Sequence, residues 1–214
     1  MEVKRFSKFG LSLEFLVIFL FLPLAFYCHL IPLSPIPALW LVAIYCFARL
    51  RHDASFDRRK LWNLAAFHPR AQQIFLLFLV SAIGVGLCVA YFAPQLLFNF
   101  IKRDPIFWAL LMVLYPIFSV YPQGVVYRAF FFQRYQALLP NDYWRIAISA
   151  LAFSFVHIIF RNPIAVSLTL IGGVIFAWRY AATGSLFTSA FEHALYGCWM
   201  FTVGLGDFFY KGAR

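Results

Sequence analysis

Residues 121–135 read YPQGVVYRAFFFQRY and place a polar segment inside the most apolar half of the chain. Arg128 lies near the middle of this segment, with Gln123 before it and Gln133 after it. A guanidinium at membrane depth is costly, so it is rarely kept without a partner or a function. We therefore expect Arg128 either to belong to a functional site or to tie helices together through backbone carbonyls, and we expect the flanking sequence to form the helices around it.

The composition of the chain is that of a polytopic membrane protein. Of its 214 residues, 64% are apolar, 28 are Phe and only 8 are acidic. This balance excludes a soluble domain, because too little polar surface would be available to cover it. The net charge of +10 comes from basic residues between apolar runs, and no nucleic-acid-binding motif accompanies them. We therefore expect anionic membrane lipid, and no nucleic acid, as a partner.

The apolar runs predict an all-α transmembrane bundle of about seven helices, because a membrane-spanning helix needs about 20 apolar residues. We expect helices over residues 10–30, 37–50, 73–94, 106–139, 143–160, 163–182 and 185–203. The fourth is too long for one straight span, and Pro122 with Gly124 is the expected position of a kink. Pro140, Asn141 and Asp142 are expected to form the turn and the N-terminal cap before the fifth helix.

The basic residues predict the orientation of the chain. They cluster at Lys4, Arg5 and Lys8 and in the loop of residues 51–70, whereas the loop between the first two helices has none. The positive-inside rule therefore favours a cytoplasmic N-terminus. The first apolar run lacks a convincing signal-peptidase site, so we expect it to be retained as the first helix.

Three of the predicted helices carry a polar row on an otherwise apolar surface. Because residues four apart share a helical face, these rows contain Gln123 in the fourth helix, His157 in the fifth and His193 in the seventh. Arg128 lies on the row next to that of Gln123. Lipid cannot solvate such side chains, so the rows are expected to face the bundle interior or a wet cavity. We therefore expect these four residues to line a shared site.

The order and spacing of these residues resemble the CPBP family, which comprises the CAAX prenyl proteases and bacteriocin-processing proteins and is also called the Abi or glutamic intramembrane protease family. Its motifs read EExxxR, FxxxH and Hxxx followed by Asn or Asp. The residues of this chain at the motif positions are Gln123, Gly124 and Arg128, then Phe153 and His157, and then His193 and Gly197. The resemblance covers residues 105–204, about half of the chain. It implies an intramembrane endopeptidase in which a carboxylate and histidines activate water.

The first motif departs from the family pattern, because Gln123 and Gly124 replace the expected pair of glutamates. Gln123 is neutral and cannot serve as a general base, although it can hold a water molecule or an oxyanion. Glu192 beside His193, or Glu14 in the first helix, could supply the missing carboxylate or pair with Arg128. A buried arginine requires such a partner.

The resemblance implies roles for the residues that match. His157 would hold or activate water, His193 would stabilise the oxyanion, and Arg128 would fix the cavity. The candidate catalytic residues are thus His157, His193, Arg128, Gln123 and Glu192. Two histidines and a carboxylate could bind zinc, but the chain has no HExxH motif and no assured third ligand, so we expect no metal or other cofactor.

Arginines near predicted helix ends have a different expected role. Arg145, Arg161 and Arg179 are expected to be anchors at the membrane interface, with long side chains that reach the head groups.

Two functions remain open. The first is an endopeptidase that hydrolyses a peptide bond of a hydrophobic or lipidated, including prenylated, membrane-associated substrate. The second is an inactive relative that binds a membrane peptide or lipid, and the missing glutamate pair favours it; a transporter is less favoured because the chain shows no internal repeat. We divide the chain into the N-terminal helices with the basic cytoplasmic loop, residues 1–104, and the CPBP-like core, residues 105–214, and expect an integral protein of a bacterial inner membrane.

Overall fold

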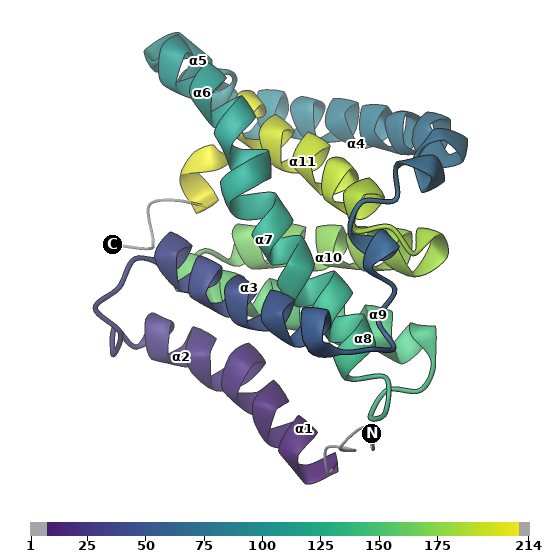
Figure 1. The fold of residues 1–214 in the computed structure, drawn as a ribbon. Helices are drawn as coiled ribbons and strands as arrows, with labels where there is room; N and C mark the ends of the chain where they lie inside the picture. The colour runs from purple at the N-terminus through teal and green to yellow at the C-terminus, as the bar shows by residue number, and fades with distance from the viewer. Residues whose placement is uncertain (1–7, 210–214) are drawn as a thin grey trace.

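The computed structural model describes residues 8–209, and these residues form an all-α bundle without strands (Figure 1). The predicted fold class is therefore confirmed. Lys4 and Arg5, which contribute to the predicted orientation, lie outside the described residues.

The long helices lie close to their predicted positions. They are α1 (Lys8–Leu16), which continues through the π-helical stretch Val17–Phe21 into α2 (Leu22–Tyr27), α3 (Pro35–His52), α4 (Ala71–Phe92), α9 (Asp142–Val156), α10 (Pro163–Thr183) and α11 (Leu186–Val203). Among residues 8–209, five helical segments are long and apolar enough to cross a membrane, namely Lys8–Tyr27, His68–Phe92, Pro105–Arg134, Asp142–Phe160 and Pro163–Thr183.

The segment Pro105–Arg134 is the long central helix. It consists of α6 (Pro105–Tyr115), α7 (Tyr121–Gly124) and α8 (Phe131–Arg134), joined by the π-helical stretches Pro116–Val120 and Val125–Phe130. Thus two π-helical stretches flank Pro122, where the sequence predicts a kink. The helix ends at Arg134, earlier than predicted, because the chain turns at Tyr135, whose carbonyl accepts hydrogen bonds from the amides of Leu138 and Leu139.

The prolines of the central helix free carbonyl groups that bind neighbouring helices. In an α-helix the Phe118 carbonyl would accept a hydrogen bond from residue 122, but Pro122 has no N–H. The indole N–H of Trp40 in α3 donates to this carbonyl instead, at 3.0 Å. This bond attaches α3 to the central helix just before the polar segment.

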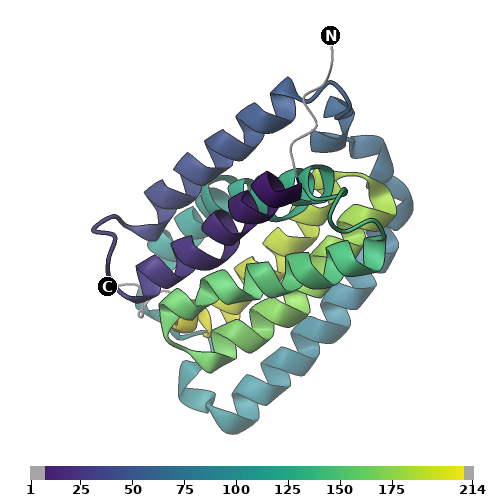
Figure 2. The same ribbon diagram turned by 90° about the horizontal axis from the view of Figure 1, so that it is seen from below.

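The helices pack so that the central helix is surrounded by several others. The stretch Val125–Phe130 contacts α3 on one side and α9 and α10 on the other, and α11 packs against α4, α6 and α10. Figure 2 shows α9 and α10 side by side. The Ser149 hydroxyl of α9 donates to the Tyr127 carbonyl, and the Ser189 hydroxyl of α11 donates to the Phe176 carbonyl of α10. These buried bonds fix the helices that carry the candidate site.

The segment between α3 and α4 is tied to the central helix through Asp53. Its carboxylate accepts hydrogen bonds from Ser55 and from the Gln133 amide of α8, the latter at 2.9 Å. Burial raises the pKa of Asp53, but the hydrogen bonds of Ser55 and Gln133 and the charge of Arg134 outweigh burial and hold this pKa below its usual value.

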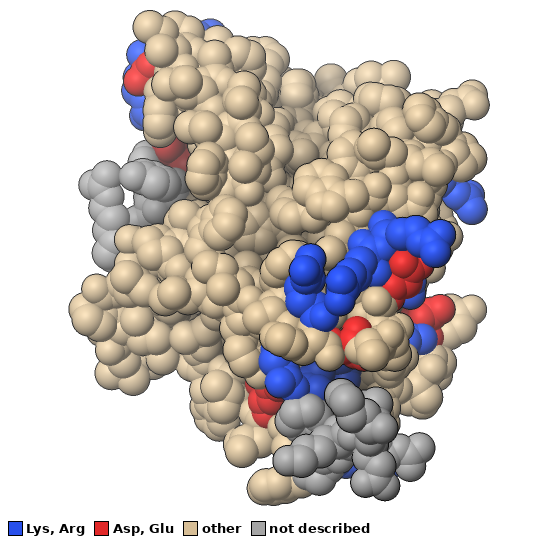
Figure 3. All heavy atoms as spheres, in the orientation of Figure 1, with Lys and Arg blue, Asp and Glu red and all other residues tan. Residues whose placement is uncertain are grey.

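The molecular surface separates apolar from charged regions. Many large apolar side chains of the long helices are exposed, and on the face shown in Figure 3 lysines and arginines gather in one zone. Exposed basic residues at the end of α3 and in the segment after it include Arg51, Arg58 and Arg59. A second, smaller group contains Lys102 and Arg103 of the short helix α5 (Asn99–Arg103). A surface on which apolar side chains are exposed and charges gather in separate zones is one that a bilayer can solvate.

Candidate functional site

Arg128 lies in the π-helical stretch Val125–Phe130, in which every residue is buried. Its side chain is 1% exposed, and within residues 8–209 none of its three guanidinium nitrogens has a hydrogen-bond partner. The guanidinium carbon lies 4.3 Å from the centre of the Phe153 ring and 5.5 Å from that of Phe176. Aromatic faces therefore surround the cation.

His157 lies at the end of α9, at the start of the 3-10 turn His157–Phe160, and is buried. Its Nδ1 is 2.6 Å from the Phe153 carbonyl. A carbonyl only accepts hydrogen bonds, so Nδ1 carries the proton of the neutral ring. The lone pair of Nε2 is thereby left to accept a proton, which is what a general base requires.

His193 is buried in the middle of α11. Its ring stacks on Phe176 with 4.5 Å between centroids and lies edge-on to Phe153 at 5.4 Å. Nε2 lies 3.5 Å from the Tyr115 hydroxyl, and Nδ1 is buried without a hydrogen-bond partner in the described chain. When the hydroxyl donates to Nε2, the ring proton lies on Nδ1, which is then a free donor.

The structure thus brings Arg128, His157 and His193 together around one ring, that of Phe153. The His157 centroid is 4.8 Å from it, and the other two groups lie within 5.4 Å. We call these three residues with Phe153 and Phe176 the polar cluster. Its members come from the central helix, α9, α10 and α11, so the cluster depends on tertiary packing.

Gln123 is placed one turn before Arg128 and is directed along its own helix. Its amide nitrogen donates to the Ser119 hydroxyl at 2.7 Å. The neighbouring Gly124 is packed against α11, because a Cβ added at this position would lie 2.8 Å from Leu186 Cδ1. Leu186 therefore fills the space in which a side chain at position 124 would begin.

At the third motif, too, a side chain from a neighbouring helix fills the space next to a glycine. A Cβ added at Gly197 would collide with the ring and the hydroxyl of Tyr115. Tyr115, which the sequence motifs do not identify, thus occupies the space next to Gly197 and places its hydroxyl near His193. A large residue on one helix opposite a glycine on another is the only sequence signal of this contact.

Glu192 does not pair with Arg128. Its carboxylate accepts two hydrogen bonds from Arg179, from Nε at 2.7 Å and from Nη2 at 3.1 Å, and both side chains are fully buried. Gln73 of α4 accepts from Nη1 of the same guanidinium at 3.1 Å. The prediction that Arg179 is an interface anchor is therefore wrong: it is an interior residue that joins α10, α11 and α4. Arg161, by contrast, is exposed.

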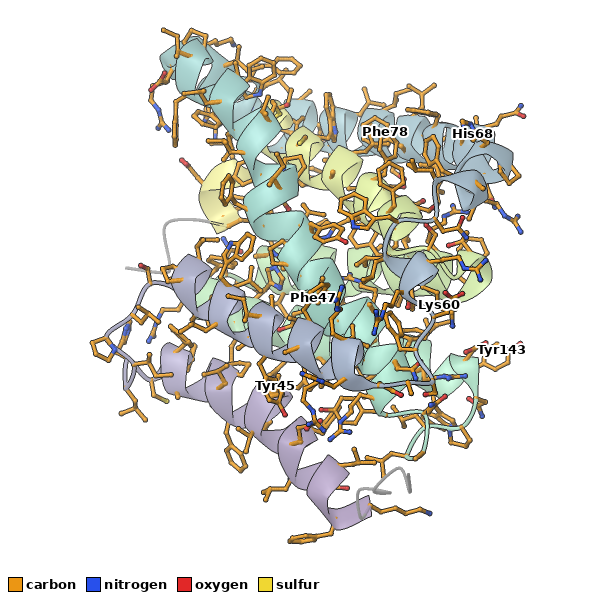
Figure 4. All side chains as sticks on the ribbon, in the orientation of Figure 1. Tyr45, Phe47, Lys60, His68, Phe78 and Tyr143 are labelled. Atoms are coloured by element: carbon orange, nitrogen blue, oxygen red, sulfur yellow. The ribbon has the colours of Figure 1, made fainter. Side chains whose placement is uncertain are left out.

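Glu14 does not pair with Arg128 either. It accepts hydrogen bonds from Arg134 at 2.8 and 3.0 Å and from the hydroxyls of Tyr45 and Tyr135. Figure 4 shows Tyr45 extending from α3 toward α1. The two carboxylates that the sequence offers as partners of Arg128 are thus both bound to other arginines.

An apolar groove lies between α4, α11 and the central helix. Its volume is about 340 Å³, and its walls come from α4, α11 and the start of the stretch Pro116–Val120. Phe78 lines it from α4, and Ala194, which follows His193, lines it from α11. Figure 4 shows where Phe78 projects from α4. Such a groove can accept a hydrocarbon chain or an apolar peptide side chain.

The donor set of the polar cluster contains two imidazoles and a guanidinium. Within residues 8–209, no three His, Cys, Asp or Glu side chains are close enough together to hold a metal ion. The cluster instead combines a possible proton acceptor, His157 Nε2, with buried N–H donors of Arg128 and His193. This combination suits proton transfer and stabilisation of an oxyanion.

Comparison with known protein families gives one match. The model described as type II CAAX prenyl endopeptidase Rce1-like matches residues 105–199, which contain every member of the polar cluster. No curated protein and no solved structure matches the chain. The match agrees with the family that the three motifs indicate, and with the apolar helices it identifies an integral membrane protein. The match over residues 105–199 therefore supports the assignment to the CPBP family, the family of the CAAX prenyl proteases.

Proposed function

We propose that the protein is an intramembrane endopeptidase of the CAAX-protease type, which hydrolyses a peptide bond of a membrane-associated substrate. One observation carries this proposal: His157, oriented by the Phe153 carbonyl, lies in the same buried cluster as the N–H donors of Arg128 and His193. A base and oxyanion donors on one side of a reacting carbonyl are what peptide hydrolysis requires.

The proposed reaction uses His157 as general base. Nε2 takes a proton from a water molecule while the water oxygen attacks the scissile carbonyl. The oxyanion that forms is stabilised by Nδ1–H of His193 and by the positive charge of Arg128. The imidazolium of His157 then donates its proton to the leaving amine, and the carbon–nitrogen bond breaks. The products are a new carboxyl group and a free amine.

Tyr115 and Glu192 have supporting roles in this proposal. The Tyr115 hydroxyl orients His193 through Nε2. Glu192 holds α11 against α10 through Arg179, which keeps the adjacent His193 in place. Gln123 is available to hold the water molecule from the turn that precedes Arg128. No metal ion is part of the proposed reaction, because the cluster offers two imidazoles and a cation as donors.

The apolar groove suits the hydrophobic part of such a substrate. Ala194, one of the residues in its walls, follows His193 in α11, and the walls are almost wholly apolar. We infer that an isoprenoid chain or apolar side chains of the substrate bind there. The basic segment after α3 suits the anionic inner leaflet, which supports our proposal of a cytoplasmic N-terminus and a location in a bacterial inner membrane.

A second candidate function is binding without cleavage. It is favoured by a specific observation, since within residues 8–209 no carboxylate hydrogen-bonds to Arg128. The two functions differ in their product. We expect the purified protein in liposomes to convert a farnesylated peptide into two fragments and, in water enriched in ¹⁸O, to place one heavy oxygen in the new carboxyl group. Saturable binding of the peptide with recovery of only intact peptide would instead establish the binding protein.

A further inference from the structure

The arginines of the bundle interior differ in their hydrogen-bond partners. Arg179 and Arg134 each hold a carboxylate through two nitrogens, with Glu192 and Glu14 as their partners. Arg128 is as buried as Arg179, yet within residues 8–209 no protein group accepts a hydrogen bond from any of its nitrogens. Arg128 is therefore an interior arginine for which the described chain provides no carboxylate partner.

The aromatic contacts of Arg128 do not replace a carboxylate. Phe153 and Phe176 interact with the charge of the guanidinium, at 4.3 and 5.5 Å. The five N–H donors of a guanidinium point outward in its plane and require acceptors. A planar carboxylate matches two of these donors at once, which gives the strongest hydrogen-bonded pairing available to arginine.

A second unpaired donor lies beside the first. Nδ1 of His193 is buried without a partner, and His193 contacts the same two rings, Phe153 and Phe176, as Arg128. An anion bound at the guanidinium can therefore also receive a hydrogen bond from an imidazole. The surrounding rings, and Leu186 packed on Gly124, crowd the guanidinium, so we consider only a small ligand.

From these contacts we propose that Arg128 and His193 form a binding site for a small carboxylate anion, of the size of formate or acetate. The ligand supplies, from solution, the counter-ion that Glu192 and Glu14 supply to the other interior arginines. The proposal concerns binding alone and holds whether or not the protein cleaves peptides.

The test is a titration of the purified full-length protein in detergent with sodium formate, at constant ionic strength set by sodium chloride. Bound formate stabilises the folded state, so the unfolding temperature is expected to rise and then saturate. In Arg128→Met the apparent affinity for formate is expected to fall at least about tenfold, the loss expected for a pair of charge-assisted hydrogen bonds. Arg103→Met, which removes an exposed arginine that also lies over a phenylalanine ring, keeps the full response.

A second variant supplies the carboxylate within the chain. Residues 124 and 128 are four apart and lie on the same side of the helix, so Gly124→Glu can reach Arg128 once Leu186→Ala has made room for it. The double variant is expected to unfold at a higher temperature than Leu186→Ala alone and to lose the formate response. The proposal is overturned by an unfolding temperature that does not depend on formate, by an equal response of Arg128→Met, or by an equal saturable response to chloride.

Discussion

The buried ion pair of Arg179 and Glu192 provides a direct test of which contacts stabilise the helices that carry the candidate site. Glu192→Gln removes the negative charge and leaves the guanidinium fully buried beside a neutral amide. Breaking a buried ion pair by changing one partner costs about 3–5 kcal/mol. Gln73 still accepts one hydrogen bond from Arg179, and the new amide oxygen can accept another, so we expect the lower end of this range, about 3 kcal/mol.

A double-mutant cycle separates the pair from its surroundings. Arg179→Met leaves Glu192 as an uncompensated buried anion, and we expect a similar loss of about 3 kcal/mol. The double variant with both changes has no buried charge left, so its loss should be smaller than the two single losses combined by at least about 2 kcal/mol. The free energies of unfolding are measured by titrating the purified protein in mixed micelles with a denaturing detergent.

The control is a pair at the surface. Asp142 pairs with Arg145 at 2.7 Å but its side chain is 59% exposed, so Asp142→Asn should change the free energy of unfolding by less than about 1 kcal/mol. The structural role assigned to Glu192 is refuted if Glu192→Gln unfolds like the unaltered protein while peptide cleavage is abolished. Glu192 would then act in the reaction itself.

Three further perturbations address the scaffold. Trp40→Phe removes the donor to the Phe118 carbonyl and should lower the free energy of unfolding by about 1 kcal/mol in the same micelle titration; an unchanged value contradicts the assigned hydrogen bond. Glu14→Gln weakens the two hydrogen bonds from Arg134 and should cost about 2 kcal/mol, whereas a gain in stability would show that the pair is unfavourable. The folded-state pKa of Asp53 is lowered, so its ionised form stabilises the fold above its unfolded pKa of about 4, and this contribution disappears as the pH falls through the folded pKa. The stability difference between the unaltered protein and Asp53→Asn should therefore shrink between about pH 6 and pH 3, and a difference that does not vary with pH contradicts this assignment.

The fold could be predicted largely from apolar runs and from turn residues. The predicted cap at Asn141 is confirmed, since its side chain accepts a hydrogen bond from the Trp144 amide. The sequence predicts the end of the central helix too late, at residue 139 and not at Arg134, because an apolar sequence continues through the turn that starts at Tyr135. Hydrophobicity reports burial in lipid or protein, and it does not report where a backbone turns.

The site was predicted less completely than the fold. The spacing of Arg128, His157 and His193 indicated polar faces, and the structure places these faces around one ring. The partner of Glu192 could not be predicted from helical spacing alone, because Arg179 lies on the preceding helix and their meeting depends on how α10 and α11 are rotated. Their positions on either side of the turn at residues 183–185 are the sequence signal of this contact.

The most direct test of the account is the rate at which the protein in liposomes cleaves a farnesylated peptide, compared with that of His157→Ala. His52→Ala serves as the matched control, since His52 lies exposed at the end of α3. We predict cleavage by the unaltered protein, the same rate for His52→Ala, and a rate at least about 100-fold lower for His157→Ala because the general base is lost. Cleavage by His157→Ala at the unaltered rate would contradict the claim that the polar cluster is the active site.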